Sequence, residues 1–170
     1  MKHRIACLAL VALLGSAQAE DTPRTAAAGP DPAPGLVPLH GGYAFDQPEI
    51  LIRQRLFGLA HGLSLLAAAC LDLPAHSVAI QDAYAAWHAR QGKTIEVIVH
   101  DLADYYFGPR AGEAQWPDLS RALNLADNIH SAMGEVTLHA ACATLPAAIS
   151  RPRYALDKLL AGDAESEPAE

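Results

Sequence analysis

The sequence predicts an all-α fold, a single-domain bundle of four to six helices closed by one disulfide. Three observations support this prediction. Apolar side chains recur every three or four residues over most of residues 46–161, a spacing that places them on one face of a helix. Pro and Gly residues separate these periodic segments and are typical of helix ends. No segment has the clean alternation of apolar and polar residues that is typical of a half-buried strand.

The first helix is expected to begin at the Asp46-Gln47-Pro48-Glu49 sequence. This pattern resembles a capping box, and proline is tolerated in the first turn of a helix. The other faces of this helix are also largely apolar or small, so we expect neighbours on several sides. Its inward residues are Ile52, Leu56, Leu59, Leu63, Leu66 and Cys70.

Two further helices are predicted over residues 77–90 and 94–107. Ser77 and Thr94 are the expected N-caps, and Gly92 is the expected stop between the two helices. Residues 95–99 alone could pass for a strand, but the longer periodic pattern favours a helix. The inward residues are Ile80, Tyr84 and Trp87 in one helix and Ile95, Ile98, Val99, Leu102 and Tyr106 in the other.

A fourth helix is predicted to start at Trp116-Pro117-Asp118. Its apolar spacing continues toward Cys142, so one long helix and two shorter ones are both possible. Pro146 should break or kink this region, and residues 154–160 can add a last short turn. The residues of the spacing are Leu119, Ala122, Ala126, Ile129, Met133 and Val136.

The N-terminus has the pattern of a secretory signal peptide over residues 1–19. Lys2 and Arg4 precede an apolar run at residues 5–14, and Ala17-Gln18-Ala19 follows as a cleavage site. A membrane span is the alternative, but this run is shorter than the roughly 20 residues that a span needs. We therefore expect a periplasmic or secreted protein without a membrane span.

The two ends of the exported chain differ from its centre in composition. Residues 20–45 are rich in Pro, Ala and Gly, which predicts a disordered or extended leader. Residues 162–170 form an acidic tail. The helical domain is therefore expected over residues 46–161.

Cleavage after Ala19 would remove Cys7 and leave Cys70 and Cys142. Two cysteines in an oxidising compartment predict one disulfide, with two buried free thiols as the alternative. The sequence has no Cys-x-x-Cys motif, which argues against redox chemistry.

The net charge excludes one class of partner. The full chain carries −7, and loss of Lys2 and Arg4 would make this −9. A nucleic-acid binder needs a basic footprint for phosphates. An acidic surface instead favours a protein partner with a basic surface, which it would attract during encounter.

Seven histidines remain after cleavage, and imidazoles together with carboxylates bind zinc or copper. His100 lies between Glu96 and Asp104 at helical spacing, and Glu135 precedes His139 by four residues. A solvated polar helix face is the simpler explanation for such pairs.

His61 is the third metal candidate, because it lies on the most apolar helix. A buried imidazole needs a partner. The alternative is a core histidine that forms a hydrogen bond to a neighbouring helix.

Motifs for catalysis are missing from the sequence, so an enzyme is the less favoured hypothesis. There is no Gly-x-Ser-x-Gly, Ser-x-x-Lys, His-Glu-x-x-His or Gly-rich phosphate loop. Asp101 and Asp104 could form a carboxylate pair, but a polar surface explains them better.

The aromatic residues suggest an interface. Successive helix residues point in directions about 100° apart, so Tyr105, Tyr106 and Phe107 cannot all face one core. Exposed aromatics are favoured as interface anchors, although a tyrosine can also cover the core with its hydroxyl in water. The interface candidates are Trp87, Tyr105, Tyr106 and Trp116.

The helix order and the cysteine pair together resemble the small helical periplasmic immunity proteins that neutralise secreted amidase toxins. In those proteins a Cys-Leu near the end of an early helix can pair with a cysteine near the C-terminus, as Cys70-Leu71 and Cys142 would here. The resemblance implies a partner-binding role. We therefore expect an exported, non-catalytic module that binds another exported or envelope protein as an inhibitor, immunity or accessory factor. The alternative is a periplasmic metal-binding protein that uses histidines and carboxylates.

Overall fold

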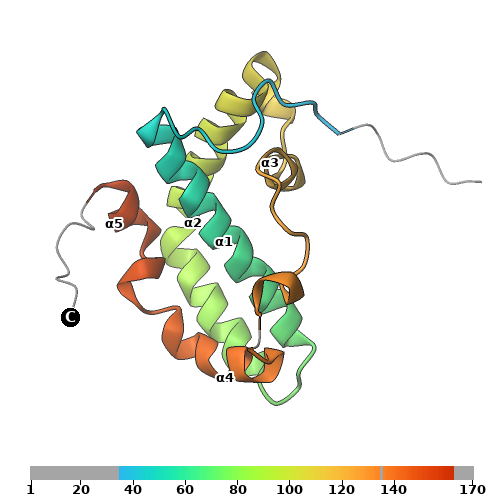
Figure 1. The fold of residues 1–170 in the computed structure, drawn as a ribbon. Helices are drawn as coiled ribbons and strands as arrows, with labels where there is room; N and C mark the ends of the chain where they lie inside the picture. Colours follow the sequence, from blue (N-terminus) through green and yellow to red (C-terminus); the bar gives the residue numbers. More distant parts are fainter. Residues whose placement is uncertain (1–34, 135, 163–170) are drawn as a thin grey trace, which may run out of the picture. The chain divides into compact units, whose positions relative to one another are not determined.

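The computed structural model describes residues 35–134 and 136–162, which fold into helices and contain no strand. The predicted all-α class is therefore confirmed. Three short 3₁₀ helices cover Gly108–Glu113, His130–Ala132 and Pro152–Tyr154. The α-helices of the described residues are α1 (Pro48–Leu71), α2 (Ser77–Phe107), α3 (Trp116–Ala122), α4 (Leu138–Ala148) and α5 (Leu156–Leu160) (Figure 1).

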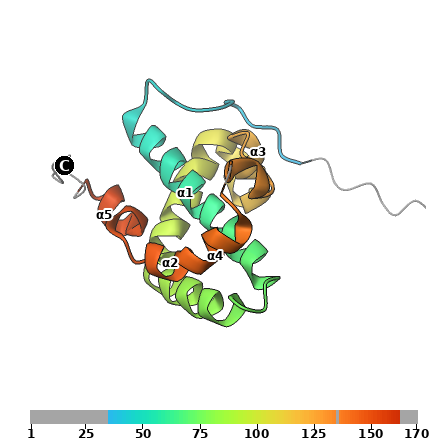
Figure 2. The ribbon, with the colours of Figure 1, turned by 60° about the horizontal axis from the view of Figure 1, so that its bottom comes forward.

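The two long helices, α1 and α2, lie side by side and are joined by the short loop of residues 72–76 (Figures 1 and 2). α1 also contacts α4 and α5. These several neighbours explain why its sequence is apolar on most faces. The fully buried side chains of α1 and α2 are Gln54, Phe57, Cys70, Ile80, Trp87, Ile98, Leu102 and Tyr106.

By length and composition alone, α1 could cross a membrane. A core helix of a globular protein passes the same test. Here α1 packs against three other helices and carries two buried polar residues, Gln54 and His61.

α2 is one continuous helix, so the stop predicted at Gly92 is wrong. Gly92 is the middle residue of α2, and the helix changes direction near its middle in both views (Figures 1 and 2). Glycine costs a helix only about 1 kcal/mol relative to alanine. Tertiary contacts on either side outweigh this cost, because Trp87 and Ile98 are each only 1% exposed. The N-caps predicted at Ser77 and Thr94 are also absent, since the N-cap is His76 and Thr94 lies inside the helix.

The region from Trp116 to Ala148 forms two shorter α-helices, α3 and α4, rather than one long one. α3 ends in a Schellman motif, in which Asn124 has a positive φ of 53°. The Leu125 N–H donates to the Ser120 carbonyl at 2.8 Å, and the Asn124 N–H donates to the Arg121 carbonyl at 3.0 Å. α4 begins only at Leu138 and continues through Pro146 to Ala148.

A capping box forms at α3 and not at α1, where it was predicted. The N-cap of α1 is Gln47, and its side chain makes no capping hydrogen bond. At α3, the Gln115 side chain accepts from the Asp118 N–H, and the Asp118 carboxylate accepts from the Gln115 N–H.

Residues 36–47, which we call the strap, are held against the helices. Most of them fall within the predicted leader of residues 20–45. The Leu39 N–H donates to the Tyr106 carbonyl at 2.6 Å, and the Gly42 N–H donates to the Ala122 carbonyl at 3.1 Å. These carbonyls belong to the last turns of α2 and α3, where they have no partner within their own helix. The strap therefore caps the C-terminal ends of two helices.

A buried polar network holds the strap in place. The Gln54 Oε1 accepts from the Ala44 N–H at 2.9 Å, and its Nε2 donates to the Tyr106 hydroxyl at 2.7 Å. The Tyr106 hydroxyl in turn donates to the Gly42 carbonyl at 2.6 Å. Gln54 and Tyr106 are both completely buried, so each of these polar groups needs its partner.

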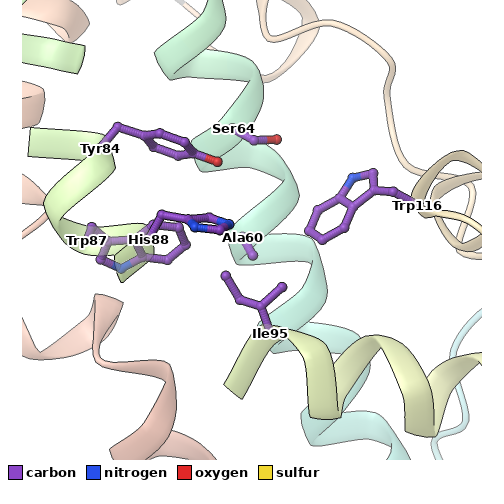
Figure 3. Close-up of a pocket in the computed structure, with 7 residues that line it drawn as sticks. All are labelled: Ala60, Ser64, Tyr84, Trp87, His88, Ile95 and Trp116. Carbon is purple, nitrogen blue, oxygen red and sulfur yellow. The ribbon is translucent and has the colours of Figure 1, made fainter. Parts of the chain in front are cut away.

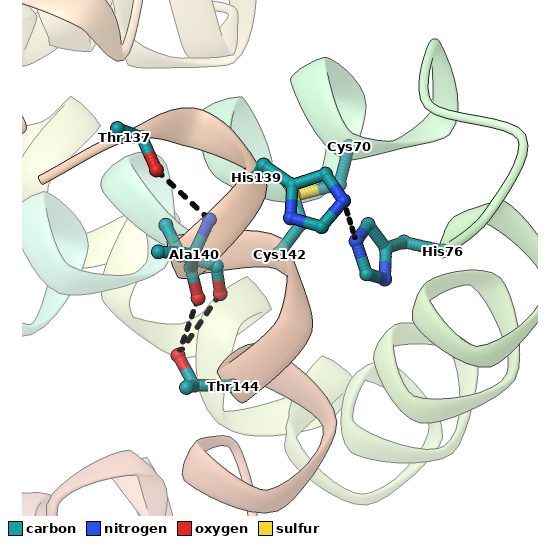
Figure 4. The surroundings of a disulfide bond; sticks show 8 residues. Cys70, His76, Thr137, His139, Ala140, Cys142 and Thr144 are labelled. Atoms are coloured by element: carbon teal, nitrogen blue, oxygen red, sulfur yellow. Dashed lines mark hydrogen bonds between the residues drawn. A yellow bond between two sulfur atoms is a disulfide. The ribbon is translucent and has the colours of Figure 1, made fainter.

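The predicted disulfide is confirmed. Cys70 in the last turn of α1 is bonded to Cys142 in α4 (Figure 4). The signal peptide predicted for residues 1–19, residues 20–34 of the predicted leader and residues 163–170 of the predicted tail lie outside the described residues.

Candidate functional site

A pocket of about 270 Å³ lies among α1, α2 and α3 (Figure 3). It is close to the lower limit of about 300 Å³ for sites that bind small molecules. Its lining is mostly apolar and includes both tryptophans of the chain. The residues that line it are Ala60, Ser64, Tyr84, Trp87, His88, Ile95 and Trp116.

Three of these residues bring polar groups to the pocket. Burial raises the pKa of the Tyr84 phenol above its usual value of 10.0, and its hydroxyl is protonated at neutral pH, as in an ordinary tyrosine. The Ser64 hydroxyl donates to the His61 carbonyl at 2.8 Å, so its proton is not directed at the imidazole of His88. The pocket is therefore mostly apolar, and its polar groups are the hydroxyls of Ser64 and Tyr84 and the imidazole of His88.

His61 lies beside this pocket and is only 8% exposed. Its Nε2 is 2.7 Å from the Ala126 carbonyl oxygen, and its Nδ1 accepts from the Trp116 indole N–H at 2.9 Å. An indole N–H can only donate and a carbonyl can only accept. The two partners therefore fix His61 as the neutral tautomer with its proton on Nε2.

This geometry places His61 as a core histidine that joins α1 to α3 and to the segment that follows α3. The rings of Phe57 and Trp116 pack beside it, with centroids 4.4 Å apart. Because both ring nitrogens already have partners, a metal could bind only if one of these hydrogen bonds broke. The arrangement matches the alternative of a hydrogen-bonded core imidazole.

His100 lies on the surface of α2, and its side chain is 75% exposed. Its Nδ1 is 3.4 Å from the Asp104 carboxylate and 3.6 Å from the Asp101 carboxylate. Asp101 also accepts from Arg53 Nε at 2.6 Å, which links α2 to α1. Asp101 is thus paired with Arg53, and both aspartates face the His100 imidazole, so they do not form an isolated carboxylate pair.

His139 lies in the first turn of α4, next to the disulfide, and its Nε2 is 3.2 Å from the Nε2 of His76 (Figure 4). The sequence analysis paired His139 with Glu135, which lies outside the described residues. Cys142 is bonded to Cys70 in the disulfide, so it has no thiolate to offer a metal. Within residues 35–134 and 136–162, no three His, Cys, Asp or Glu side chains gather as a metal cluster.

The structure divides the four aromatic interface candidates into two pairs. Trp87 and Tyr106 lie in the core, 1% and 0% exposed, and present no surface to a partner. Tyr105 and Trp116 are half-buried. Tyr105 stacks against His40 of the strap with a centroid distance of 4.6 Å, and Trp116 faces the pocket.

The most exposed apolar side chains near these residues lie on the strap. Val37, Leu39 and Phe45 are 81%, 65% and 78% exposed. Sequence reasoning missed all three because it assigned their segment to the leader. The signal that could have found them is an apolar residue at nearly every second or third position of a segment otherwise rich in Gly and Pro.

No protein-family model matches the chain, and no curated protein or solved structure matches it at a significant level.

Proposed function

We propose that the protein is an exported, non-catalytic helical module that binds another exported or envelope protein, as an inhibitor, immunity factor or accessory subunit. The observation that carries this proposal is the strap, which is fixed by buried hydrogen bonds and yet directs large apolar side chains into solvent. The disulfide supports the exported part of the proposal, because such bonds persist in oxidising compartments.

The strap suits a docking function because its order is established before binding. Its backbone is hydrogen-bonded to α2 and α3, and its Ala44 is 4% exposed beneath the surface. A partner would therefore not have to supply the free energy that orders a flexible segment. Val37, Leu39 and Phe45 remain free to enter a partner's apolar groove, and an exposed apolar strip of this kind is typical of a protein interface.

The charges beside the strip indicate the chemistry of the partner. Asp46 directly follows Phe45, Glu49 lies four residues after it, and both are exposed. We therefore propose a partner surface with an apolar groove edged by Lys or Arg. Such charges would mainly raise the rate of association and set its orientation.

The proposal is tested by photo-crosslinking in the native envelope. A photoreactive phenylalanine analogue at position 45 should capture one protein in a saturable manner, and excess unlabelled protein should compete with it. The captured protein is then purified, and its affinity is measured for the chain with Val37→Ser and with Phe45→Ser. Each substitution should weaken binding at least about tenfold, as expected for an interface anchor.

Val78→Ser is the matched control for Val37→Ser. Val78 is 70% exposed but lies at the start of α2, away from the strap. Its substitution should leave the affinity unchanged. Equal losses for Val37→Ser and Val78→Ser, or no saturable capture at position 45, would contradict a docking role for the strap.

A further inference from the structure

The end of the molecule that the disulfide closes carries two histidines in direct contact. His76 is the last residue of the loop between α1 and α2, and His139 is the second residue of α4. Their Nε2 atoms lie 3.2 Å apart, their ring centroids are separated by 4.5 Å, and the rings meet edge to face at 72° (Figure 4). The two residues are 63 positions apart in the sequence, so only the tertiary fold brings them together.

The backbone that carries both histidines is held in place by a disulfide and by hydrogen bonds. The Cys70–Cys142 bond ties the end of α1 to α4 within a few residues of each histidine. The loop is closed by hydrogen bonds from the Leu73 N–H to the Cys70 carbonyl and from the His76 N–H to the Leu73 carbonyl, at 3.1 and 2.9 Å.

α4 is also held at its first turn. The Thr137 hydroxyl accepts from the Ala140 N–H at 3.2 Å (Figure 4). The backbone segments that carry the two imidazoles are therefore held together by covalent and hydrogen bonds in addition to the contact between the rings.

The separation of the two Nε2 atoms matches that of two ligands on one metal ion. Two nitrogens bound to a tetrahedral zinc at about 2.0–2.1 Å lie about 3.3 Å apart, and the Nε2 atoms here are 3.2 Å apart. Two neutral imidazoles can share only one proton, so one Nε2 must donate and the other accept. A cation placed between them would instead receive both lone pairs.

We propose that His76 and His139 form a two-histidine site for a divalent transition metal, with Zn²⁺ as the ion that fits the observed spacing. On binding, the donor ring moves its Nε2 proton to Nδ1 through solvent, and both rings coordinate as neutral imidazoles. His139 is exposed and His76 is half-buried, so water can fill the remaining positions. The site uses no carboxylate and is independent of the docking role of the strap.

The other two metal candidates of the sequence, His61 and His100, are poorer ligands, so binding at His76 and His139 can be distinguished from binding at either of them. Both nitrogens of His61 have protein partners. His100 is flanked by two carboxylates from its own helix at 3.4 and 3.6 Å, but no second imidazole faces it among the described residues. Metal binding should therefore depend on His76 and His139 and not on His100.

Calorimetric titration with zinc chloride tests the proposal. The unaltered protein should bind one Zn²⁺, and its melting temperature should rise as zinc is added. His76→Ala and His139→Ala should each weaken this binding by more than about tenfold. A loss of about tenfold is already typical when a residue that only hydrogen-bonds to a metal ligand is replaced. The metal-free melting temperatures of both variants should stay near that of the unaltered chain, because the altered side chains lie near the surface.

His100→Ala is the matched control, since it removes an exposed imidazole from α2 and should leave zinc affinity unchanged. A second readout uses Cu²⁺, whose electron paramagnetic resonance spectrum reports bound nitrogen ligands. The spectrum of the unaltered protein should contain two imidazole nitrogens that are absent from the His76→Ala/His139→Ala double variant. Zinc binding that survives the double substitution, or that is lost in His100→Ala, would overturn the proposal, as would the absence of one-to-one binding.

Discussion

The Gln54 side chain on α1 donates a hydrogen bond to the Tyr106 hydroxyl on α2 at 2.7 Å, and the same hydroxyl donates to the Gly42 carbonyl of the strap at 2.6 Å. In addition to its backbone hydrogen bonds to α2 and α3, the strap is thus attached by one buried amide and one buried phenol. Because both side chains are fully buried, neither can exchange its partner for water.

Tyr106→Phe should lower the free energy of unfolding by about 1–3 kcal/mol, because it removes two buried hydrogen bonds and leaves the Gln54 Nε2 and the Gly42 carbonyl only their mutual hydrogen bond, which is longer at 3.3 Å. Urea denaturation measures this change. The strap should also become easier to cleave, so chymotrypsin should cut after Phe45 faster than in the unaltered protein. Tyr43→Phe is the matched control, since Tyr43 is 37% exposed; an equal loss in this variant would contradict the network.

The free energy of unfolding should fall at high pH because the Tyr106 phenol ionises. Burial raises the pKa of its phenol from 10.0 to about 12, while the hydrogen bond from Gln54 acts in the opposite direction. The folded state holds this proton more tightly than the unfolded state. The corresponding stability is therefore complete below about pH 10 and is lost as the pH rises toward 12. The difference in free energy of unfolding between the unaltered protein and Tyr106→Phe should decrease over this pH range. A difference that stays constant would contradict the raised pKa of Tyr106.

His61→Ala should destabilise the protein by about 2–4 kcal/mol, because it leaves the Trp116 N–H and the Ala126 carbonyl without partners and opens space in the core. Nitrogen NMR of the unaltered protein should detect the proton of His61 on Nε2. His100→Ala, at an exposed position, should change stability by less than about 0.5 kcal/mol. A proton found on Nδ1 would contradict the assignment of the tautomer.

Replacement of both Cys70 and Cys142 by Ser should cost about 4 kcal/mol on the chain-entropy model, since the bridge spans 72 residues. Thermal unfolding with and without reductant measures this. Reductant should lower the melting temperature of the disulfide-bonded protein and leave that of the double variant unchanged. A thiol-reactive dye should find neither Cys70 nor Cys142 reactive before reduction.

The ion pair between Arg53 and Asp101 should couple α1 to α2. Their side chains are 25% and 32% exposed, so a double-mutant cycle with Arg53→Met and Asp101→Asn should give a coupling of about 0.5–1 kcal/mol. The pair of Arg110 and Glu113 is the control. Both of its side chains are about 60% exposed, and its coupling should be smaller and vanish more readily in high salt.

The helices were predictable wherever apolar spacing and tertiary packing agreed. Ile80, Trp87, Ile98 and Leu102 were all expected to face inward, and each is at most 1% exposed. Gly92 was misinterpreted because a single glycine costs a helix little, whereas the packing of the residues on either side stabilises it by more.

The periodic spacing failed between α3 and α4. The apolar positions of Ala126, Ile129 and Met133 continue the helical pattern of α3, but the left-handed conformation of Asn124 ends that helix first. Asparagine after a periodic segment is a known stop signal. It was outweighed here by the apparent continuity of the apolar residues.

The candidate sites required information that the sequence does not carry locally. His76 and His139 belong to different elements and meet only because the disulfide and the loop position them. The strap is ordered because the carbonyls at the ends of α2 and α3 need donors, and its Gly- and Pro-rich composition gives no sign of this. Both features arise from contacts between segments far apart in the sequence.

The position of the disulfide also determines how the folded chain responds to tension. Both α2 and α3 lie between Cys70 and Cys142. Once the strap has been pulled away from α2 and α3, a force applied to the two ends of the chain would pass from α1 directly into α4 across the sulfur–sulfur bond, and the backbone of α2 and α3 would carry no load. Reduction of that bond would release a hidden contour length of about 240 Å, at about 3.4 Å per extended residue. The bridge thus divides the protein into a load-bearing path and a mechanically shielded loop.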